Sequence, residues 1–139
     1  MPKRPIRILT YGTFDLFHIG HLRILERARE LGDELYVGVS TDTFNSEKGK
    51  RSTICFEQRL EIIAALRCVT LAFPERRWQQ KLEDVVKLKI DCFVMGDDWI
   101  GKFDFLRAHC DVKYLPKTPQ ISSSEIKSTL HRSHGPDVR

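Results

Sequence analysis

Long apolar runs, paired cysteines and a concentration of one charge sign are all missing from this sequence of 139 residues. No apolar run approaches the length that a membrane-spanning helix needs, and the N-terminus lacks the apolar region of a signal peptide. We therefore expect a cytoplasmic protein that does not contact a membrane. The four cysteines form no C-x-x-C pair. Buried free thiols are thus expected, and a disulfide framework or zinc site is not.

The charges are spread along the chain. Lys and Arg number 23 and Asp and Glu 19, which gives a formal net charge of +4. Nucleic-acid binding would call for a basic stripe or an aromatic stacking platform, and the sequence has neither, so no nucleic-acid partner is expected. The mildly basic balance favours a pocket for a phosphorylated small molecule. A hydrophobic content of 41% and this length predict one globular domain over residues 1–139.

Short β-prone segments alternate with amphipathic segments along the chain. Strands are expected at 6–11, 34–40, 68–73, 91–96 and 111–116, and helices at 21–33, 56–67, 78–89, 102–110 and 122–132. This alternation predicts the α/β class: a single-domain, doubly wound, five-stranded parallel sheet of Rossmann-like type. The domain core is expected at about 6–130, with a frayed tail at 131–139. The polar stretch 45–53 is expected to be a mobile loop.

Three unusual segments follow predicted strands. "GTFDLFHIGH" comes after the first strand, "GDDW" after the fourth and "PKTPQISSS" after the fifth. Open parallel sheets bind ligands at the carboxyl ends of their strands. We therefore expect the three segments to gather at one edge of the sheet and to form the functional site.

His18 and His21 have three candidate uses: binding a metal, serving as acid and base, or holding an anion. Metal ligands on a helix usually lie four residues apart with a supporting carboxylate, whereas Gly20 separates this pair and no third ligand is evident. Gly12 and Gly20 allow close approach of the backbone, and a helix N-terminus beginning near Gly20 attracts phosphate. Anion binding is favoured, and a pair that only stabilises the turn is the alternative.

Longer stretches carry a resemblance to a known family. "YGTFDLFHIGH", "LGDELYVGVSTDTFN", "FVMGDDWIGKFDFL" and "YLPKTPQISSSEIK" resemble the bacterial CTP:glycerol-3-phosphate cytidylyltransferases of teichoic acid and capsule synthesis, within the H-x-G-H nucleotidyltransferase superfamily. The resemblance implies a nucleotidyltransferase fold and a homodimer. It also implies direct in-line transfer of a cytidylyl group from CTP to sn-glycerol 3-phosphate, with pyrophosphate leaving and Mg²⁺ bound mainly to the triphosphate.

The resemblance also implies site residues. Catalytic roles fall on His18, His21, Lys48 and Lys50. Nucleotide binding falls on Thr13, Phe14, His18, His21, Arg67, Gly96, Asp98, Trp99, Lys117, Thr118, Ile121, Ser122 and Ser123. Acceptor binding falls on Asp15, Lys48, Arg59, Trp78 and Lys81. No side chain is firmly assigned to metal, although Asp15 is a candidate for helping to hold Mg²⁺.

Plainer roles remain open for several of these residues. Phe14 is equally explained by core packing and Asp15 by helix capping. Surface salt bridges would account for Arg59 and Lys81. A solvated surface loop would account for Lys48 and Lys50. Arg67 stands among apolar residues in "AALRCV", where an arginine needs a partner.

The last motif departs from the family pattern. Where the family has Arg-Thr-Glu-Gly-Ile-Ser-Thr, this chain has Lys-Thr-Pro-Gln-Ile-Ser-Ser at 117–123. Lysine lacks the bidentate fork of arginine, and Pro119 removes an N–H donor. The triphosphate contacts are therefore expected to be rearranged. Transfer to another phosphorylated acceptor, adenylyl transfer to FMN, and a catalytically impaired nucleotide-binding module stay open as alternatives.

Overall fold

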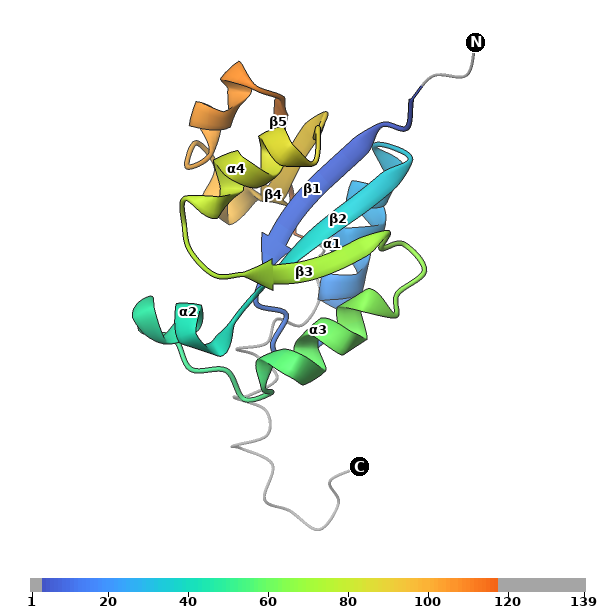
Figure 1. Cartoon of the computed structure of the whole chain (residues 1–139). Helices are drawn as coiled ribbons and strands as arrows, with labels where there is room; N and C mark the ends of the chain where they lie inside the picture. Colours follow the sequence, from blue (N-terminus) through green and yellow to red (C-terminus); the bar gives the residue numbers. More distant parts are fainter. Residues whose placement is uncertain (1–3, 118–139) are drawn as a thin grey trace.

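A computed structural model describes residues 4–117 of the chain. Its centre is a five-stranded sheet in which all neighbouring strands pair in parallel, in the order β3-β2-β1-β4-β5. The strands are β1 (Arg7–Gly12), β2 (Glu34–Ser40), β3 (Leu71–Glu75), β4 (Cys92–Gly96) and β5 (Asp111–Leu115). The expected α/β fold with a parallel sheet is confirmed, and Figure 1 shows β1 and β2 side by side at its middle.

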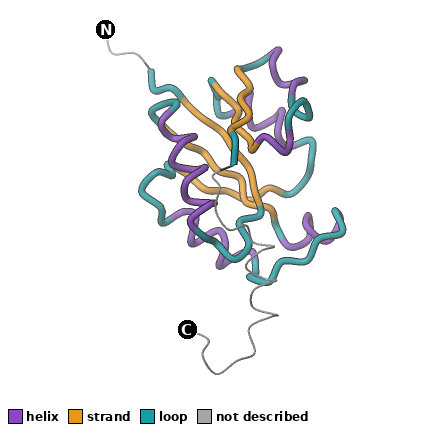
Figure 2. Tube along the Cα trace, turned by 180° about the vertical axis from the view of Figure 1, so that it is seen from behind, coloured by secondary structure: helices purple, strands orange, loops and turns teal. Residues whose placement is uncertain are grey.

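Helices lie on both faces of the sheet. They are α1 (Ile19–Glu30), α2 (Asp42–Glu47), α3 (Phe56–Ala64) and α4 (Gln80–Lys87), with short 3-10 turns η1 (Asp97–Trp99) and η2 (Asp104–Ala108). Figure 2, seen from behind, shows the face that α1 covers. Leu25 of α1 and Ile63 of α3 pack there against Ile8 of β1.

The opposite face forms a second core. Val85 of α4 and Leu106 of η2 pack against Leu9 of β1 and Phe93 of β4. Ile8 and Leu9 are adjacent in sequence yet belong to different cores, because successive side chains of a strand point to opposite faces. A strand buried on both faces reads as a continuous apolar run, which explains the appearance of "IRILTY".

The turn between β1 and α1 has an unusual backbone. Phe14 has φ 55° and Leu16 has φ 50°, in the left-handed region that non-glycine residues seldom occupy. The Phe14 ring lies so close to Gly12 that a Cβ built there would meet it at 2.7 Å. Gly12 therefore allows the chain to fold back on itself directly after β1, which places the following histidines over the strand end.

Some boundaries differ from the sequence-based expectation. Residues 45–47 of the expected loop belong to α2, where Phe44 and Asn45 are buried. The helix expected at 56–67 ends at Ala64, and β3 begins at Leu71 instead of residue 68. β3 consequently includes Pro74, which an edge strand tolerates because one side of it needs no ladder hydrogen bonds. The expected helix 122–132 and the tail 131–139 lie outside the described residues.

Within residues 4–117, no helix is both long and apolar enough to cross a membrane. All four cysteines are free thiols. Cys92 is buried, and burial raises its pKa to about 11, which keeps the thiol protonated. Cys68 and Cys110 are half-buried and Cys55 is exposed, so the expectation of buried thiols is confirmed for Cys92 and was wrong for Cys55.

Candidate active site

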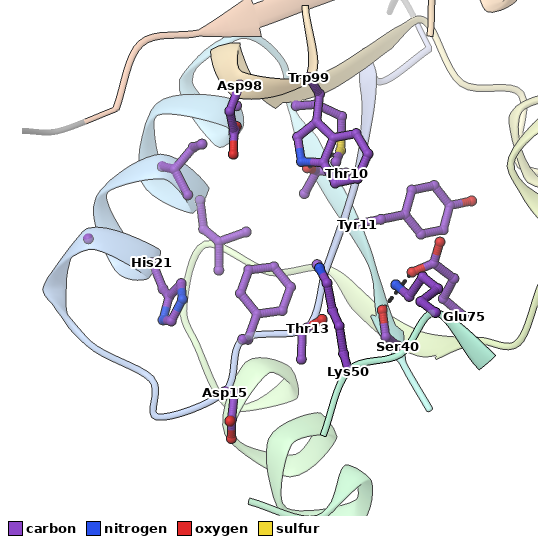
Figure 3. A pocket seen from close by; sticks show the side chains of 18 of the residues that line it. Thr10, Tyr11, Thr13, Asp15, His21, Ser40, Lys50, Glu75, Asp98 and Trp99 are labelled. Atoms are coloured by element: carbon purple, nitrogen blue, oxygen red, sulfur yellow. Dashed lines mark hydrogen bonds between the residues drawn. The ribbon is translucent and has the colours of Figure 1, made fainter. Parts of the chain in front are cut away.

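A cleft of about 620 Å³ lies at the carboxyl ends of the strands. The segment after β1 and the segment after β4 both contribute to its lining, as the position of their motifs predicts. The sequence-predicted residues that line it are Thr13, Phe14, Asp15, His18, His21, Lys48, Lys50, Trp78, Lys81, Gly96, Asp98, Trp99 and Lys117. Figure 3 shows His21 and Asp15 on one side of this cleft, Asp98 and Trp99 on a second, and Ser40 with Glu75 on a third.

The two histidines cap helix α1 reciprocally. His18 is the N-cap residue, and its Nδ1 accepts a hydrogen bond from the Gly20 N–H at 3.0 Å. Nδ1 of His21 accepts from the His18 N–H at 3.2 Å. Together they form a capping box built from histidines, in which each ring satisfies a backbone donor of the first turn. The turn-stabilising role considered for the pair is therefore real.

The same bonds fix the tautomer of both rings. Because each Nδ1 accepts a hydrogen bond, each neutral imidazole carries its proton on Nε2. Burial, followed by the neighbouring His18, lowers the pKa of His21 to about 4, against the opposing effect of Asp15. His21 is therefore neutral near pH 7. With the proton on Nε2, each ring carries an N–H group beside a helix N-terminus, and such a position suits a phosphate group.

Lys48 and Lys50 come from the segment that follows α2. Both lysines line the cleft, and Figure 3 shows the Lys50 side chain pointing into it. The Lys48 Nζ lies 4.3 Å from the centroid of the Phe44 ring. Desolvation, together with nearby cations, lowers the pKa of Lys48, with Glu75 acting in the opposite direction. A concentration of cations on this wall favours a polyanionic ligand.

The β4 side of the cleft carries the second motif. Gly96 ends β4, and a Cβ built on it would lie 2.9 Å from an Asp98 carboxylate oxygen, so the missing side chain leaves room for that carboxylate. Asp98 is exposed and lies 3.6 Å from the Lys117 ammonium. Trp99 packs beside Phe103 with ring centroids 5.6 Å apart. A carboxylate next to a flat apolar wall is suited to a nucleobase with an exocyclic amine.

The β2 and β3 side holds a buried ion pair. Lys81 and Glu75 contact each other directly, and their side chains are each 3% exposed. Glu75 also accepts a hydrogen bond from Ser40 Oγ at 2.8 Å. The Lys81 ammonium lies over the Trp78 ring, 4.2 Å from the ring centroid. The surface salt bridge considered for Lys81 is thus replaced by a desolvated pair inside the cleft wall.

Arg59 is fully buried and does not line the cleft. It donates hydrogen bonds to the carbonyls of Thr13, Ser40 and Ile54, each at 2.8 Å, and to the Asp42 carboxylate at 2.7 Å. The surface role considered for it was wrong, because the side chain is buried and donates to four acceptors of the protein itself. Arg59 instead holds together the backbone that carries the cleft residues.

Asp15 has a comparable structural task. Its two oxygens accept the backbone N–H groups of Thr53 and Ile54, both at 2.8 Å. The carboxylate therefore anchors the segment before α3 to the turn after β1. Helix capping was one of the roles considered for Asp15, but the N–H groups that it binds belong to residues before the first residue of α3. Thr13 lies nearby, with its Oγ1 3.4 Å from the Asn45 side-chain oxygen.

Arg67 is exposed, and it does not line the cleft. It lies beyond the end of α3, on the connection that returns to the amino end of β3. The apolar neighbours of Arg67 in the sequence therefore do not bury it. Thr118, Ile121, Ser122 and Ser123 lie outside the described residues.

Ser40, Glu75 and Phe103 line the cleft without having been singled out from the sequence. Ser40 and Glu75 end their strands, so the rule that ligands bind at carboxyl ends of parallel strands could have found them. The early boundary expected for the third strand hid Glu75. Among residues 4–117, no group of three His, Cys, Asp or Glu side chains is placed to hold a metal ion.

Known proteins are similar to this chain in both sequence and fold. The model of the cytidylyltransferase-like family matches residues 9–129. Glycerol-3-phosphate cytidylyltransferase of Bacillus spizizenii is 52% identical over 89% of this chain and 96% of its own, and that of Staphylococcus aureus is 50% identical over 90% and 95%. FAD synthase of Pyrococcus abyssi is 38% identical over 69% of this chain and 66% of its own.

A solved structure has a fold similar to that of this chain. A lipopolysaccharide core biosynthesis protein from Thermoplasma volcanium superposes with a TM-score of 0.69 and 27% identity, over 84% of this chain and 99% of that one. The family match covers most of this chain, including the histidine turn and the Asp98 segment. The resemblance found in the sequence is thereby confirmed: the chain belongs to the cytidylyltransferase-like family, as a relative of the glycerol-3-phosphate cytidylyltransferases.

Proposed function

We propose that this chain transfers a cytidylyl group from CTP to sn-glycerol 3-phosphate, forming CDP-glycerol and pyrophosphate. The observation that carries the proposal is the 50–52% identity to glycerol-3-phosphate cytidylyltransferases across nearly their whole length. The cleft agrees with it: a cationic and N–H-rich centre suits a triphosphate, and the Asp98 and Trp99 side suits a cytosine.

The reaction needs no covalent enzyme intermediate. A phosphate oxygen of the acceptor attacks the α-phosphorus of CTP, a new P–O bond forms, and the bond to the β-phosphate breaks as pyrophosphate leaves. The Nε2–H groups of His18 and His21 donate to the phosphate oxygens as negative charge develops. Lys48 and Lys50 neutralise the leaving pyrophosphate. Catalysis then consists of positioning and charge stabilisation.

Mg²⁺ belongs to this proposal as a component of the CTP complex. A divalent ion bound to the triphosphate offsets its charge. Asp15 already accepts two backbone N–H groups, and no three-ligand cluster lies within residues 4–117, so we assign no ligand set of the chain to the ion.

The oligomeric state, the cellular location and the pathway are proposed from the resemblance to the family. We place the protein in the cytoplasm as a homodimer that supplies CDP-glycerol to teichoic acid or capsule synthesis. Light scattering of the purified chain tests the dimer, for which a monomer mass would be the contrary result.

The decisive experiment is a pyrophosphate-release assay with CTP or ATP against glycerol 3-phosphate, other polyol phosphates and FMN, with mass spectrometry of the product. We expect CTP and glycerol 3-phosphate to give the highest kcat/KM. The FAD synthase similarity makes ATP with FMN the second candidate, and activity with that pair alone would replace our proposal. Binding of CTP without turnover on any acceptor would identify an impaired module.

A further inference from the structure

Two buried polar residues stand at the carboxyl ends of neighbouring strands on one side of the cleft. Ser40 ends β2 and Glu75 ends β3, and the two residues are partners in the strand register. Ser40 is 1% exposed and Glu75 is 3% exposed, yet both contribute to the cleft lining. Figure 3 shows them side by side at the cleft wall. Burying a polar group without a hydrogen-bond partner costs free energy, so the partners of these two residues indicate what they do.

Each Glu75 oxygen has one partner inside the protein. Oε1 accepts from Ser40 Oγ at 2.8 Å, and Oε2 accepts from the Lys81 ammonium. A carboxylate has about four acceptor positions in total. Two positions therefore remain for donors that enter from the cleft. The carboxylate is also held in a fixed orientation, which is what recognition of a hydroxyl group requires.

Lys81 removes the net charge of this wall and at the same time closes it to cations. Its ammonium lies over the Trp78 ring at 4.2 Å and over the Tyr11 ring at 4.8 Å. Aromatic faces of this kind hold cationic ligands, and here a side chain of the protein already occupies them. A ligand group at this wall is therefore neutral, with hydroxyl donors for Glu75 and an apolar edge for Trp78.

The order of the strands assigns this wall to one end of the bound substrates. His18 and His21 stand at the end of β1, at the centre of the sheet. Asp98 and Trp99 follow β4 on one side of β1, whereas Ser40 and Glu75 end β2 and β3 on the other. With the base beside Asp98 and the reacting phosphates at the histidines, the remaining wall receives the tail of the acceptor.

We propose that Glu75, fixed by Ser40 and Lys81, accepts hydrogen bonds from the hydroxyl groups of the phosphorylated acceptor and so selects a neutral polyhydroxyl tail. This inference rests on the proposed function, since it names the acceptor-recognising group of that same site. A site built to bind a hydroxyl group discriminates strongly against analogues without one, because its polar groups are then left unpaired.

The test compares glycerol 3-phosphate with propyl phosphate, which has the same carbon chain and no hydroxyl groups. We measure kcat/KM for both acceptors at saturating CTP, in the wild type and in Glu75→Gln. The wild type should prefer glycerol 3-phosphate by about 100-fold or more. Glu75→Gln should reduce that preference by about tenfold or more, mainly through a higher KM for glycerol 3-phosphate, with the KM for CTP nearly unchanged.

Glu83→Gln is the matched control, because Glu83 also pairs with a basic residue but is exposed. It should leave the preference unaltered. Glu75→Gln leaves the Lys81 charge buried without its partner, which can prevent folding. The double variant Glu75→Gln with Lys81→Met removes both charges, and it should show the same loss of preference.

The outcomes separate this inference from the function on which it rests. If the wild type forms no CDP-glycerol, the proposed function fails. If it forms CDP-glycerol but uses propyl phosphate equally well, the acceptor tail is not recognised and the Glu75 inference is overturned, whether or not the variants fold. The inference is also overturned if a folded variant keeps the wild-type preference, since Glu75 would then have only a structural role.

Discussion

The imidazole rings of His18 and His21 stack with their centroids 4.0 Å apart, and both turn their Nδ1 atoms to backbone N–H groups of the same helix. The helix cap and the proposed phosphate donors are therefore the same two side chains. Nδ1 of each ring fixes the start of the helix, and the Nε2–H group of each ring is the proposed phosphate donor.

Because different nitrogens of His18 cap the helix and donate to the phosphates in our proposal, the two roles should be separable by substitution. His18→Asn should keep the cap, because asparagine is a favoured N-cap residue, but it removes the Nε2–H donor. We expect kcat to fall about 10²- to 10³-fold, which is typical for the loss of one transition-state donor. Thermal melts should show a midpoint close to that of the wild type.

His18→Ala is the comparison, because it removes the cap as well and should lower stability by about 1 kcal/mol. If His18→Asn retained wild-type turnover, the imidazole would serve the helix alone.

The depressed pKa of His21 predicts how stability depends on pH. Unfolded, the ring titrates near pH 6.5, whereas in the folded protein its pKa is about 4. Between these values the unfolded state binds more protons, so the stability due to this group is present above pH 6.5 and is lost as the pH falls toward 4. Melting midpoints measured from pH 8 to 4 should show this loss in the wild type.

His21→Gln lacks the titrating ring, so its melting midpoint should decline less over the same pH range. A parallel decline in both proteins would show that other groups cause the acid sensitivity.

Arg59 should be a determinant of stability. Arg59→Lys keeps the charge but cannot reach the carbonyls of Thr13, Ser40 and Ile54 together, and each buried carbonyl left without a donor costs about 1–3 kcal/mol. We expect the free energy of unfolding, measured by urea denaturation, to fall by about 3 kcal/mol.

Arg23→Lys is the control for Arg59, because Arg23 forms an exposed pair with Glu26. It should change stability by less than about 0.5 kcal/mol. Equal effects of the two substitutions would mean that the Arg59 contacts contribute little.

Lys117 should act on the nucleotide. Its ammonium lies beside Asp98, at the rim where the last motif departs from the family pattern. Lys117→Met should raise the KM for CTP several-fold and leave the KM for glycerol 3-phosphate unchanged, whereas Lys117→Arg should lower the KM for CTP because the guanidinium can bind two phosphate oxygens.

Lys113→Met is the control for Lys117, because Lys113 is exposed on β5 and does not line the cleft. A change in the KM for the acceptor after Lys117→Met would assign this residue to the other end of the cleft.

Local patterns in the amino-acid sequence were sufficient to predict the class of fold and the edge of the sheet at which the site forms. A strand covered on both faces must be apolar throughout, and an amphipathic helix must show its three- to four-residue spacing. These local constraints predicted β2 at its observed bounds and placed His18, Asp98 and Lys117 after strand ends. The ends of parallel strands meet at one edge, so those motifs had to meet as well.

Which of the charged residues enter the cleft depends on packing between segments that are distant in the sequence. Arg59 is buried because its acceptors come from segments 46 and 19 residues away, and nothing near it in the sequence shows them. Arg67 left the expected helix because that helix ends three residues earlier. Glu75 meets Ser40 and Lys81 only because β2 and β3 pair in register, with α4 folding back beside them. Periodicity reports how a segment is buried, but pairing between distant segments depends on the packed sheet.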